Sequence, residues 1–503
     1  MPVLQRPDPV PQLNWEPKRA RRLGEEAVGL WEEFLGRLPD LPIDRGLDQE
    51  QVAGGVLMDV PEEGLADEDL LEHVRKVVFD YSMYPGHPGF MGYISGAGTI
   101  PGVVADFIAA MLNQNVGGWR LGPAANEIET HLISWFARRF GLPEGAGGLI
   151  VSGGALANFV GLKAAREAKS GWDVRTEGVS AGDPLVLYAS AEAHDVNTRG
   201  ADMLGLGTQA VRTIPTDENY RMQVDALEAA VRSDIESGMR PIAVVASAGT
   251  VATGAVDPLP DIADLCERFG LWLHVDAAYG GPAILSDELA PLLTGIERAD
   301  SIAFDPHKWL YTPHSGGCVL VRDRQTLLDA FSIHPAYTRE DKDRTGHGID
   351  MYELGPQFSR SFWAFKIWMS LLAHGRAAYG KRIAHDVELA KYLADIVDQR
   401  PDLELMAPVT LSICCFRYVP QDLGEGGGRE EYLDELNERL MTEVQLDGRT
   451  YYSNAVLRGR FCLRPCIVNF RTEAEHIEQL VDVTGEIGQR LDAELRDPSQ
   501  VFS

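Results

Sequence analysis

Five polar side chains of this 503-residue chain follow runs of apolar residues; they are His194, Ser247, Asp276, His307 and Lys308. A carboxylate such as Asp276 at the end of a buried run is costly unless it meets a cation, a metal ion or a helix end. A lysine such as Lys308 near buried strand ends can act as a nucleophile, because desolvation and neighbouring charges favour its neutral amine. Taken singly, each could equally be a helix cap, an ion pair, a surface lysine or a structural histidine. Taken together, they predict a catalytic centre.

A glycine turn supplies a sixth feature. In VSGGALANF, residues 151–159, apolar strand residues lead into Gly153 and Gly154, and a helix begins near Ala155. The amides and the positive dipole end of a helix N-terminus bind a phosphate without lysine or arginine. An ordinary tight turn before a helix would look the same, and the segment matches neither the dinucleotide fingerprint nor the Walker loop. Both interpretations of the turn stay open.

The combination of these features fits one cofactor better than any single feature does. Pyridoxal 5'-phosphate needs a phosphate site, a lysine amine for its aldehyde, and a carboxylate that keeps the ring nitrogen protonated. The glycine turn, Lys308 and Asp276 provide these in turn. A metal-dependent hydrolase is the weaker interpretation, because Asp276 and His307 lack partners at metal-ligand spacing. We therefore expect a pyridoxal phosphate site and no metal.

The elements that must position these residues alternate between strands and helices from about residue 85 to 330. The expected strands are Gly148–Val151, Leu185–Ala189, Ala210–Ile214, Ile242–Ala248, Leu271–Val275, Ser301–Phe304 and Cys318–Val321, and helices are expected at Ala155–Ala168, Val224–Ser237 and Ile262–Arg268. This pattern predicts an α/β fold with a large, mostly parallel sheet covered on both faces. Ligands of such sheets lie beyond the carboxyl ends of the strands, so the polar residues should meet at one edge.

The two ends of the chain differ from this middle region. Four prolines in residues 1–15 indicate an extended arm, and apolar spacing predicts a helix over Lys18–Leu38 that packs on its own domain or across a subunit interface. The polar stretch 333–360 is a long loop of the kind that is functional or disordered. A smaller α+β domain follows, with strands at Leu411–Arg417 and Arg460–Asn469. The expected parts are an arm and helical segment (1–84), a large cofactor domain (85–394) with a catalytic loop at about 332–358, and a small domain (395–503).

Composition restricts the class of partner and the compartment. Lysine and arginine total 46 against 75 acidic residues, a net charge of −29. This excess argues against nucleic acid and anionic membranes as partners. The six cysteines form no CxxC pair, no apolar run is long enough to span a membrane, and the N-terminus has no apolar signal core. We expect a cytoplasmic protein with reduced thiols.

Six motifs, in this order and spacing, resemble the group II pyridoxal-phosphate decarboxylases, which include the aromatic-L-amino-acid, tyrosine and glutamate decarboxylases. The motifs are HPGFMGY at 87–93, SGGALAN at 152–158, AHDV at 193–196, HVDAAYGG at 274–281, DPHKWL at 305–310 and LRGRFCLR at 457–464. The resemblance covers about residues 20–490. It implies a homodimer of fold type I, like aspartate aminotransferase, with active sites at the interface and the N-terminal segment packed on the partner.

The resemblance also implies roles for individual residues. Lys308 corresponds to the lysine that forms a Schiff base with the cofactor, and Asp276 to the partner of the pyridinium nitrogen. His194 corresponds to the histidine stacked on the ring, and Ala278 to the small residue on its other face. Asp305 stands where the aromatic branch often has Asn, and an ionised Asp cannot donate to a phosphate. The other implied cofactor contacts are Gly153, Gly154, Ala155, Ser247, His307 and Ser359.

A tyrosine of the long loop bears on the type of reaction. Tyr337, in HPAYTRED, corresponds to the tyrosine of a mobile catalytic loop. Its phenol would deliver a proton to the α-carbon after CO2 leaves, and the loop would exclude water. Relatives with Phe there resemble aldehyde synthases that consume oxygen. Tyr337 together with His194 therefore favours simple decarboxylation.

The pocket residues bear on the substrate. One wall is expected from Tyr93, Ile94, Ser95 and Gly96, the partner subunit's wall from Asn115, Val116 and Gly117, and His194 and Tyr337 complete the pocket. This lining is smaller and more polar than that of aromatic-substrate relatives. Ser359, however, occupies a position where plant members acting on phenolic substrates have Ser. Arg120 and Arg360 stay open as contacts for a second carboxylate, although no clear arginine pair is present.

These observations predict a pyridoxal phosphate-dependent decarboxylase that converts an L-amino acid, most simply an aromatic one, to a primary amine and CO2. The alternatives are an acidic or diamino acid as substrate, aldehyde synthesis or transamination on the same cofactor, and an inactive cofactor-binding dimer. Retention of Lys308 and Tyr337 counts against the last alternative.

Overall fold

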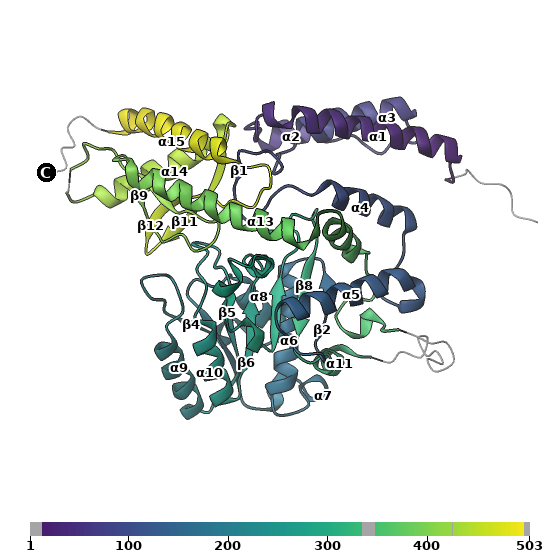
Figure 1. Ribbon diagram of the computed structural model, residues 1–503, viewed down its shortest axis with the longest axis vertical. Coiled ribbons are helices and arrows are strands. Elements are labelled where there is room, and N and C mark those ends of the chain that lie inside the picture. Colours follow the sequence, from purple (N-terminus) through teal and green to yellow (C-terminus); the bar gives the residue numbers. More distant parts are fainter. Residues whose placement is uncertain (1–12, 334–347, 425, 497–503) are drawn as a thin grey trace, which may run out of the picture.

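The computed structural model describes residues 13–333, 348–424 and 426–496. A large lower body carries the main sheet, a smaller domain lies beside its upper end, and the N-terminal helices extend away from both (Figure 1). The fold expected from the sequence is confirmed as α/β with a large sheet and a smaller C-terminal sheet domain. Tyr337 lies outside the described residues.

The large sheet has seven strands in the order β2-β8-β7-β6-β5-β3-β4. Their bounds are β2 Gly147–Val151, β3 Leu185–Ser190, β4 Val211–Ile214, β5 Arg240–Ser247, β6 Trp272–Asp276, β7 Ser301–Phe304 and β8 Gly317–Val321. Only β8 among them runs antiparallel to its two neighbours. The carboxyl ends of the other six strands therefore share one edge, as the continuous apolar runs predicted.

Helices cover both faces of this sheet. Leu149 and Val151 of β2 pack with residues of α6 (Gly154–Lys169), α8 (Val196–Met203) and α11 (Gln325–Phe331) on one face. Ile150, which points the opposite way, packs with residues of α5 (Pro123–Arg139), α9 (Val224–Glu236), α10 (Leu259–Phe269) and α13 (Trp363–Gln399). This alternation makes every residue of β2 buried and explains why its sequence is apolar without interruption.

The small domain contains a five-stranded sheet in the order β1-β11-β12-β10-β9. The strands are β1 Phe90–Met91, β9 Leu403–Leu405, β10 Phe416–Tyr418, β11 Tyr451–Leu457 and β12 Arg460–Arg464, and α14 (Arg429–Asp447) and α15 (Ala474–Leu495) pack against them. The predicted strands were too long, and β11 was not predicted. Pro465 ends β12 early because it has no amide hydrogen to donate to the ladder. In β11, Asn454 and Val456 are exposed, which weakens its apolar signal.

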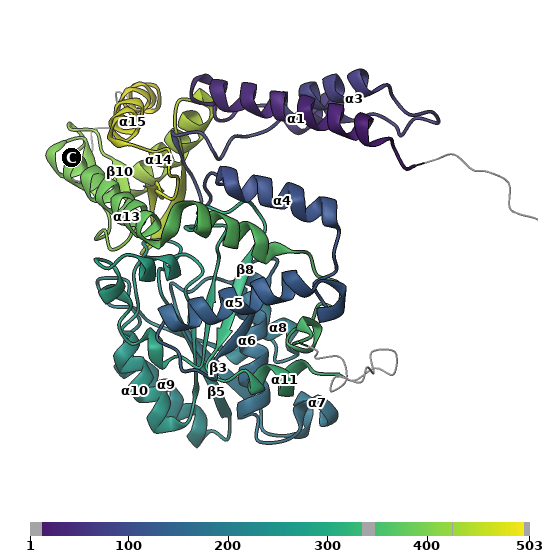
Figure 2. The ribbon, with the colours of Figure 1, turned by 45° about the vertical axis from the view of Figure 1, so that its right-hand side comes forward.

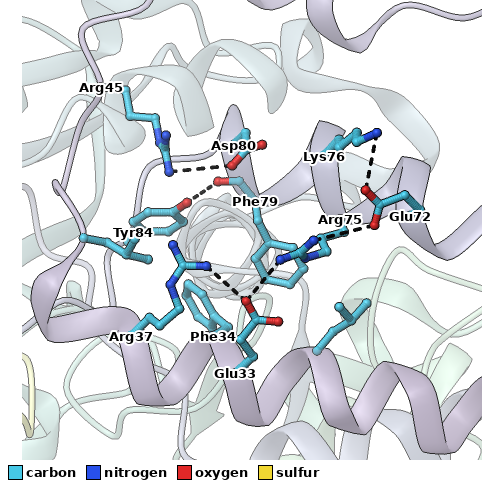
Figure 3. A pocket seen from close by; sticks show the side chains of 12 residues that line it. Glu33, Phe34, Arg37, Arg45, Glu72, Arg75, Lys76, Phe79, Asp80 and Tyr84 are labelled. Atoms are coloured by element: carbon cyan, nitrogen blue, oxygen red, sulfur yellow. Dashed lines mark hydrogen bonds and ion pairs between the residues drawn. The ribbon is translucent and has the colours of Figure 1, made fainter.

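The N-terminal helices lie to one side of the main body (Figures 1 and 2). They are α1 Pro17–Arg37, α2 Gln49–Val56 and α3 Asp67–Val74, and α1 contains no buried residue. Phe34 of α1 contacts Phe79, with ring centroids 5.3 Å apart. A cavity of about 230 Å³ beside them is lined by charges that pair with each other, as where Glu33 accepts from Arg37 and Arg75 (Figure 3). In the described ranges, no helix is both long and apolar enough to cross a bilayer.

Candidate active site

The carboxyl edge of the large sheet brings Ser247 and Asp276 together. Ser247 ends β5 and stands opposite Asp276 at the end of β6. The Ser247 amide donates to Asp257 Oδ2 over 2.7 Å, and the Ala278 amide donates to Asp276 Oδ1 over 3.1 Å. Asp276 is only 8 % exposed, so its carboxylate is fixed at the strand end and can serve a cationic group beside the sheet.

The glycine turn lies next to the loop that follows β7. Helix α6 begins at Gly154 directly after β2, and no side chain caps its first turn. A Cβ placed on Gly154 would lie 2.5 Å from Asp305 Oδ2, and one on Gly153 would lie 3.7 Å from His307 Cε1. A side chain at position 154 would therefore displace the Asp305 carboxylate. The uncapped amides of this turn and the His307 ring form a cradle of the kind that binds a phosphate.

A buried polar chain that the sequence did not predict supports this cradle. Asn158 donates from Nδ2 to the Gly154 carbonyl over 2.9 Å, and its Oδ1 lies 2.7 Å from His274 Nε2. The other ring nitrogen of His274 lies 2.7 Å from Ser301 Oγ. Burial lowers the pKa of His274 to about 4, so the ring is neutral at physiological pH. The chain ties the first turn of α6 to β6, two residues before Asp276.

Lys308 stands at the junction of the cradle and a cavity. Its Nζ lies 3.0 Å from Asp305 Oδ2. The residues after Lys308 are anchored on α13, because Trp309 Nε1 and the Tyr311 hydroxyl donate to Asp386 of that helix over 2.8 and 2.6 Å. Burial raises the pKa of Asp386 to about 6. These bonds fix the backbone on the C-terminal side of Lys308, while its side chain stays accessible to the cavity.

The cavity measures about 460 Å³ and lies between the two domains. Its lining residues are Tyr93, Ile94, Ala191, Glu192, Ala193, His194, Val251, Ala252, Lys308, Ser453, Asn454, Ala455, Val456 and Arg464. The His194 ring is held by the Val196 amide, which donates to Nδ1 over 3.0 Å. Burial raises the pKa of Glu192. Four residues predicted for the site, Tyr93, Ile94, His194 and Lys308, therefore line one cavity.

Arg464 is a functional candidate that the sequence reasoning quoted in a motif but did not single out. It is 3 % exposed, and it donates to the Tyr93 carbonyl over 3.0 Å and to Ser453 Oγ over 3.1 Å. Its Nε donates to the Ala252 carbonyl over 3.3 Å, whereas Nη2 has no hydrogen-bond partner within the described ranges. The signal available in the sequence was an arginine that follows the apolar residues Cys462 and Leu463 directly before Pro465.

A second group of predicted residues lies together but outside this cavity lining. Asn115 Oδ1 accepts from the Gly117 and Arg360 amides over 2.9 and 3.0 Å, so these residues are neighbours of Ser359. The Arg360 guanidinium is buried and binds Glu129 Oε1 and the Ile150 carbonyl, each over 2.5 Å. This engagement removes Arg360 as a contact for a substrate carboxylate. Arg120 belongs to a short helical turn that does not line the cavity either.

The residues at the strand ends fit pyridoxal phosphate. The uncapped turn at Gly154 suits its phosphate, Asp276 suits its ring nitrogen, and Lys308 suits its aldehyde. Among the described residues, no cluster of histidine, cysteine and acidic side chains could hold a metal ion. Donor types and positions thus agree with the cofactor that the sequence pattern suggested.

Comparison with known proteins places the chain in a family. The pyridoxal-dependent decarboxylase conserved domain matches residues 51–419. An aromatic-L-amino-acid decarboxylase of Bacillus atrophaeus is 34 % identical over 469 residues, covering 93 % of this chain and 95 % of the relative. A phenylacetaldehyde synthase of Arabidopsis thaliana is 28 % identical over 475 residues, covering 92 % and 94 %. The crystal structure of Oryza sativa TDC with PLP and tryptamine matches with a TM-score of 0.89 and 27 % identity, covering 96 % and 100 %. The chain therefore belongs to the pyridoxal-dependent decarboxylase family and is a carboxy-lyase that uses pyridoxal 5'-phosphate.

Proposed function

We propose that the protein decarboxylates an aromatic L-amino acid and releases the primary amine and CO2. The observation that carries this proposal is the cavity that Lys308, His194 and Arg464 share with the aromatic ring of Tyr93. It offers a nucleophilic amine, a cation for a carboxylate and apolar wall residues in one space. The similarity to an aromatic-L-amino-acid decarboxylase and to a structure that contains tryptamine supports an aromatic side chain.

The cofactor, when bound, supplies an aldehyde for attachment and a protonated ring that takes up the electrons of the broken bond. We assign its attachment to Lys308 and the partnership with its ring nitrogen to Asp276, which is held at the end of β6. The amides of Gly154 and Ala155, with His307, bind the phosphate, and His194 covers one face of the ring. Ser247 and Ala278 remain proposed neighbours of the ring.

Arg464 and Tyr337 are assigned to the substrate. The guanidinium of Arg464 has Nη2 unused by the described residues, so we assign it the substrate carboxylate. Tyr337 remains the proposed proton donor to the α-carbon, on the sequence argument alone. The positions of Tyr93 and Ile94 in the cavity lining support their assignment to the side-chain pocket.

A homodimer is part of the proposal. Helix α4 (Ile100–Leu112) exposes Phe107 and Met111 at 61 % and 68 %, and Ile100 and Leu112 at about half. Four exposed apolar side chains on one helix favour burial of that helix against another subunit. We propose that a second copy covers it and brings Asn115, Gly117 and Ser359 to the neighbouring site. All six cysteines are unpaired and buried, which supports the expected cytoplasmic location.

A screen for amine and CO2 tests the function. Purified protein should be yellow and should release equimolar amine and CO2 from tyrosine, dopa or tryptophan, while Lys308→Ala should be colourless and inactive. The same screen includes glutamate, 2,4-diaminobutyrate and cysteine sulfinate. Release from one of these alone would contradict the aromatic assignment, and peroxide with aldehyde in place of amine would contradict simple decarboxylation. Light scattering of the same preparation tests the dimer.

A further inference from the structure

Asp305 occupies an unusual place in the proposed active site. Its side chain is 2 % exposed, and one of its oxygens, Oδ2, lies 3.0 Å from Lys308 Nζ. The other oxygen, Oδ1, is buried and has no hydrogen-bond partner in the part of the chain that the structure describes. A buried carboxylate is costly without a cation, so Lys308 is the charge that compensates it. The turn between them is closed by the Lys308 amide, which donates to the Asp305 carbonyl over 3.0 Å.

The location of Asp305 beside the phosphate cradle raises a choice between two roles. A Cβ on Gly154 would lie 2.5 Å from its Oδ2, so the carboxylate packs against the first residue of α6. An ionised carboxylate cannot donate a hydrogen bond to a phosphate and repels its charge. The same carboxylate can form an ion pair with an amine 3.0 Å away. The contacts therefore favour a role on Lys308.

We propose that Asp305 is a catalytic residue that acts on Lys308 and not on the cofactor phosphate. It is the counter-ion of Nζ whenever Nζ is not bonded to the aldehyde carbon, so attachment must first break this ion pair. For attachment to the cofactor aldehyde, Nζ would first give one proton to water; the neutral amine would then bond to the aldehyde carbon, and its two hydrogens would leave with the aldehyde oxygen as water. The inference rests on the proposed function only for the role of Lys308.

Other titratable or charged groups surround this pair and must stay constant in a test. They are His307 beside Lys308, His314 on the following loop, Cys318 on β8, Asp276 at the end of β6 opposite Ala303, Lys366 on α13, and His194, Glu192 and Arg464 in the cavity wall. Asp305→Asn leaves all of them in place and changes one charge in nearly the same volume.

The pH profile of attachment tests the proposal with two probes, pyridoxal 5'-phosphate and pyridoxal, which lacks the phosphate. The full-length chain is freed of aldehyde with hydroxylamine, and the rate of imine formation is followed by absorbance from pH 6 to 10. For Asp305→Asn, the pH of half-maximal rate should fall by about one unit with both probes. Asp287→Asn, which makes the same change at an exposed carboxylate, should leave it unchanged. An unchanged midpoint, or a shift with the phosphorylated probe alone, would overturn the proposal.

A stability cycle tests the pair without any aldehyde. Lys308→Gln should lower the melting temperature by leaving Asp305 buried and uncompensated, and adding Asp305→Asn should restore part of the loss. Additive effects of the two substitutions would overturn the ion pair even if one variant folds poorly. Neither assay contains an amino acid, so a failed decarboxylation screen leaves this result intact. Borohydride trapping on Lys308 verifies its role separately.

Discussion

Replacing Arg464 should separate the binding of the substrate carboxylate from the binding of the rest of the substrate. Arg464 is buried and uses Nε and Nη1 to bond oxygens of Ala252, Tyr93 and Ser453, whereas its buried Nη2 has no hydrogen-bond partner among the described residues. A hydrogen bond to a charged group contributes about 1.5–3 kcal/mol. Arg464→Met should therefore lower kcat/KM by about 10- to 150-fold, since each 1.4 kcal/mol is a factor of ten.

The control ligand is the amine product, which has lost the carboxylate. Steady-state kinetics with the best amino acid of the screen give kcat/KM, and competition by its amine gives the inhibition constant. If Arg464 binds the carboxylate, the substitution lowers kcat/KM for the amino acid and changes the inhibition constant of the amine by no more than about a factor of two. Ser453→Ala serves as a matched variant, because it removes one support of the guanidinium without removing its charge. Equal weakening of amino acid and amine would show that Arg464 only shapes the cavity and would refute the assignment.

Three further predictions concern the buried polar chain and the loop. Asn158→Ala leaves His274 Nε2 and the Gly154 carbonyl without their partners. It should therefore destabilise the protein by about 2–4 kcal/mol in thermal melts and weaken cofactor binding in an absorbance titration. Wild-type cofactor affinity would contradict the role of these buried hydrogen bonds. His274 has a pKa of about 4 when folded and near 6.5 when unfolded, so its contribution to stability is complete above pH 6.5 and is lost as the pH falls towards 4, by about 3 kcal/mol. Urea unfolding between pH 4 and 7 should show a flatter profile for His274→Asn than for wild type, whereas parallel profiles would argue against it. Tyr337→Phe should keep the yellow colour and lower amine formation at least 100-fold, measured by chromatography of the product, and retained amine formation would remove Tyr337 as the proton donor.

The strand ends could be predicted from the sequence because most strands of the large sheet are dominated by apolar residues. Every residue of β2, β6 and β7 is buried, so these segments are recognisable as strands from their apolar residues. The polar residues that follow parallel strands lie at the same edge of the sheet. Lys308 and Asp276 became candidates by this rule alone. The family resemblance added names for their roles but was not needed to bring them together.

Residues joined over long sequence distances could not be predicted in the same way. Arg464 meets the backbone 371 residues earlier at Tyr93 and 212 residues earlier at Ala252, and no periodicity encodes such a contact. Asn158 and His274 are 116 residues apart and read singly as a polar helix residue and a strand histidine. Only the packing of α6 on β6 shows that the two side chains form a hydrogen bond with each other.

The net charge of −29 and a phosphate ligand coexist because the two act over different distances. Charges on solvated outer faces are screened beyond about 8–10 Å at physiological ionic strength. A phosphate at the first turn of α6 would instead accept hydrogen bonds from backbone amides at contact distance, and the distant surface charges do not cancel this attraction. The local balance matters more, since Asp305, Asp276 and Glu192 stand within or beside the site against Lys308 and Arg464. Pairing Asp305 with Lys308 offsets one of those negative charges while the anionic cofactor approaches, and the helix terminus then supplies the amides for its phosphate.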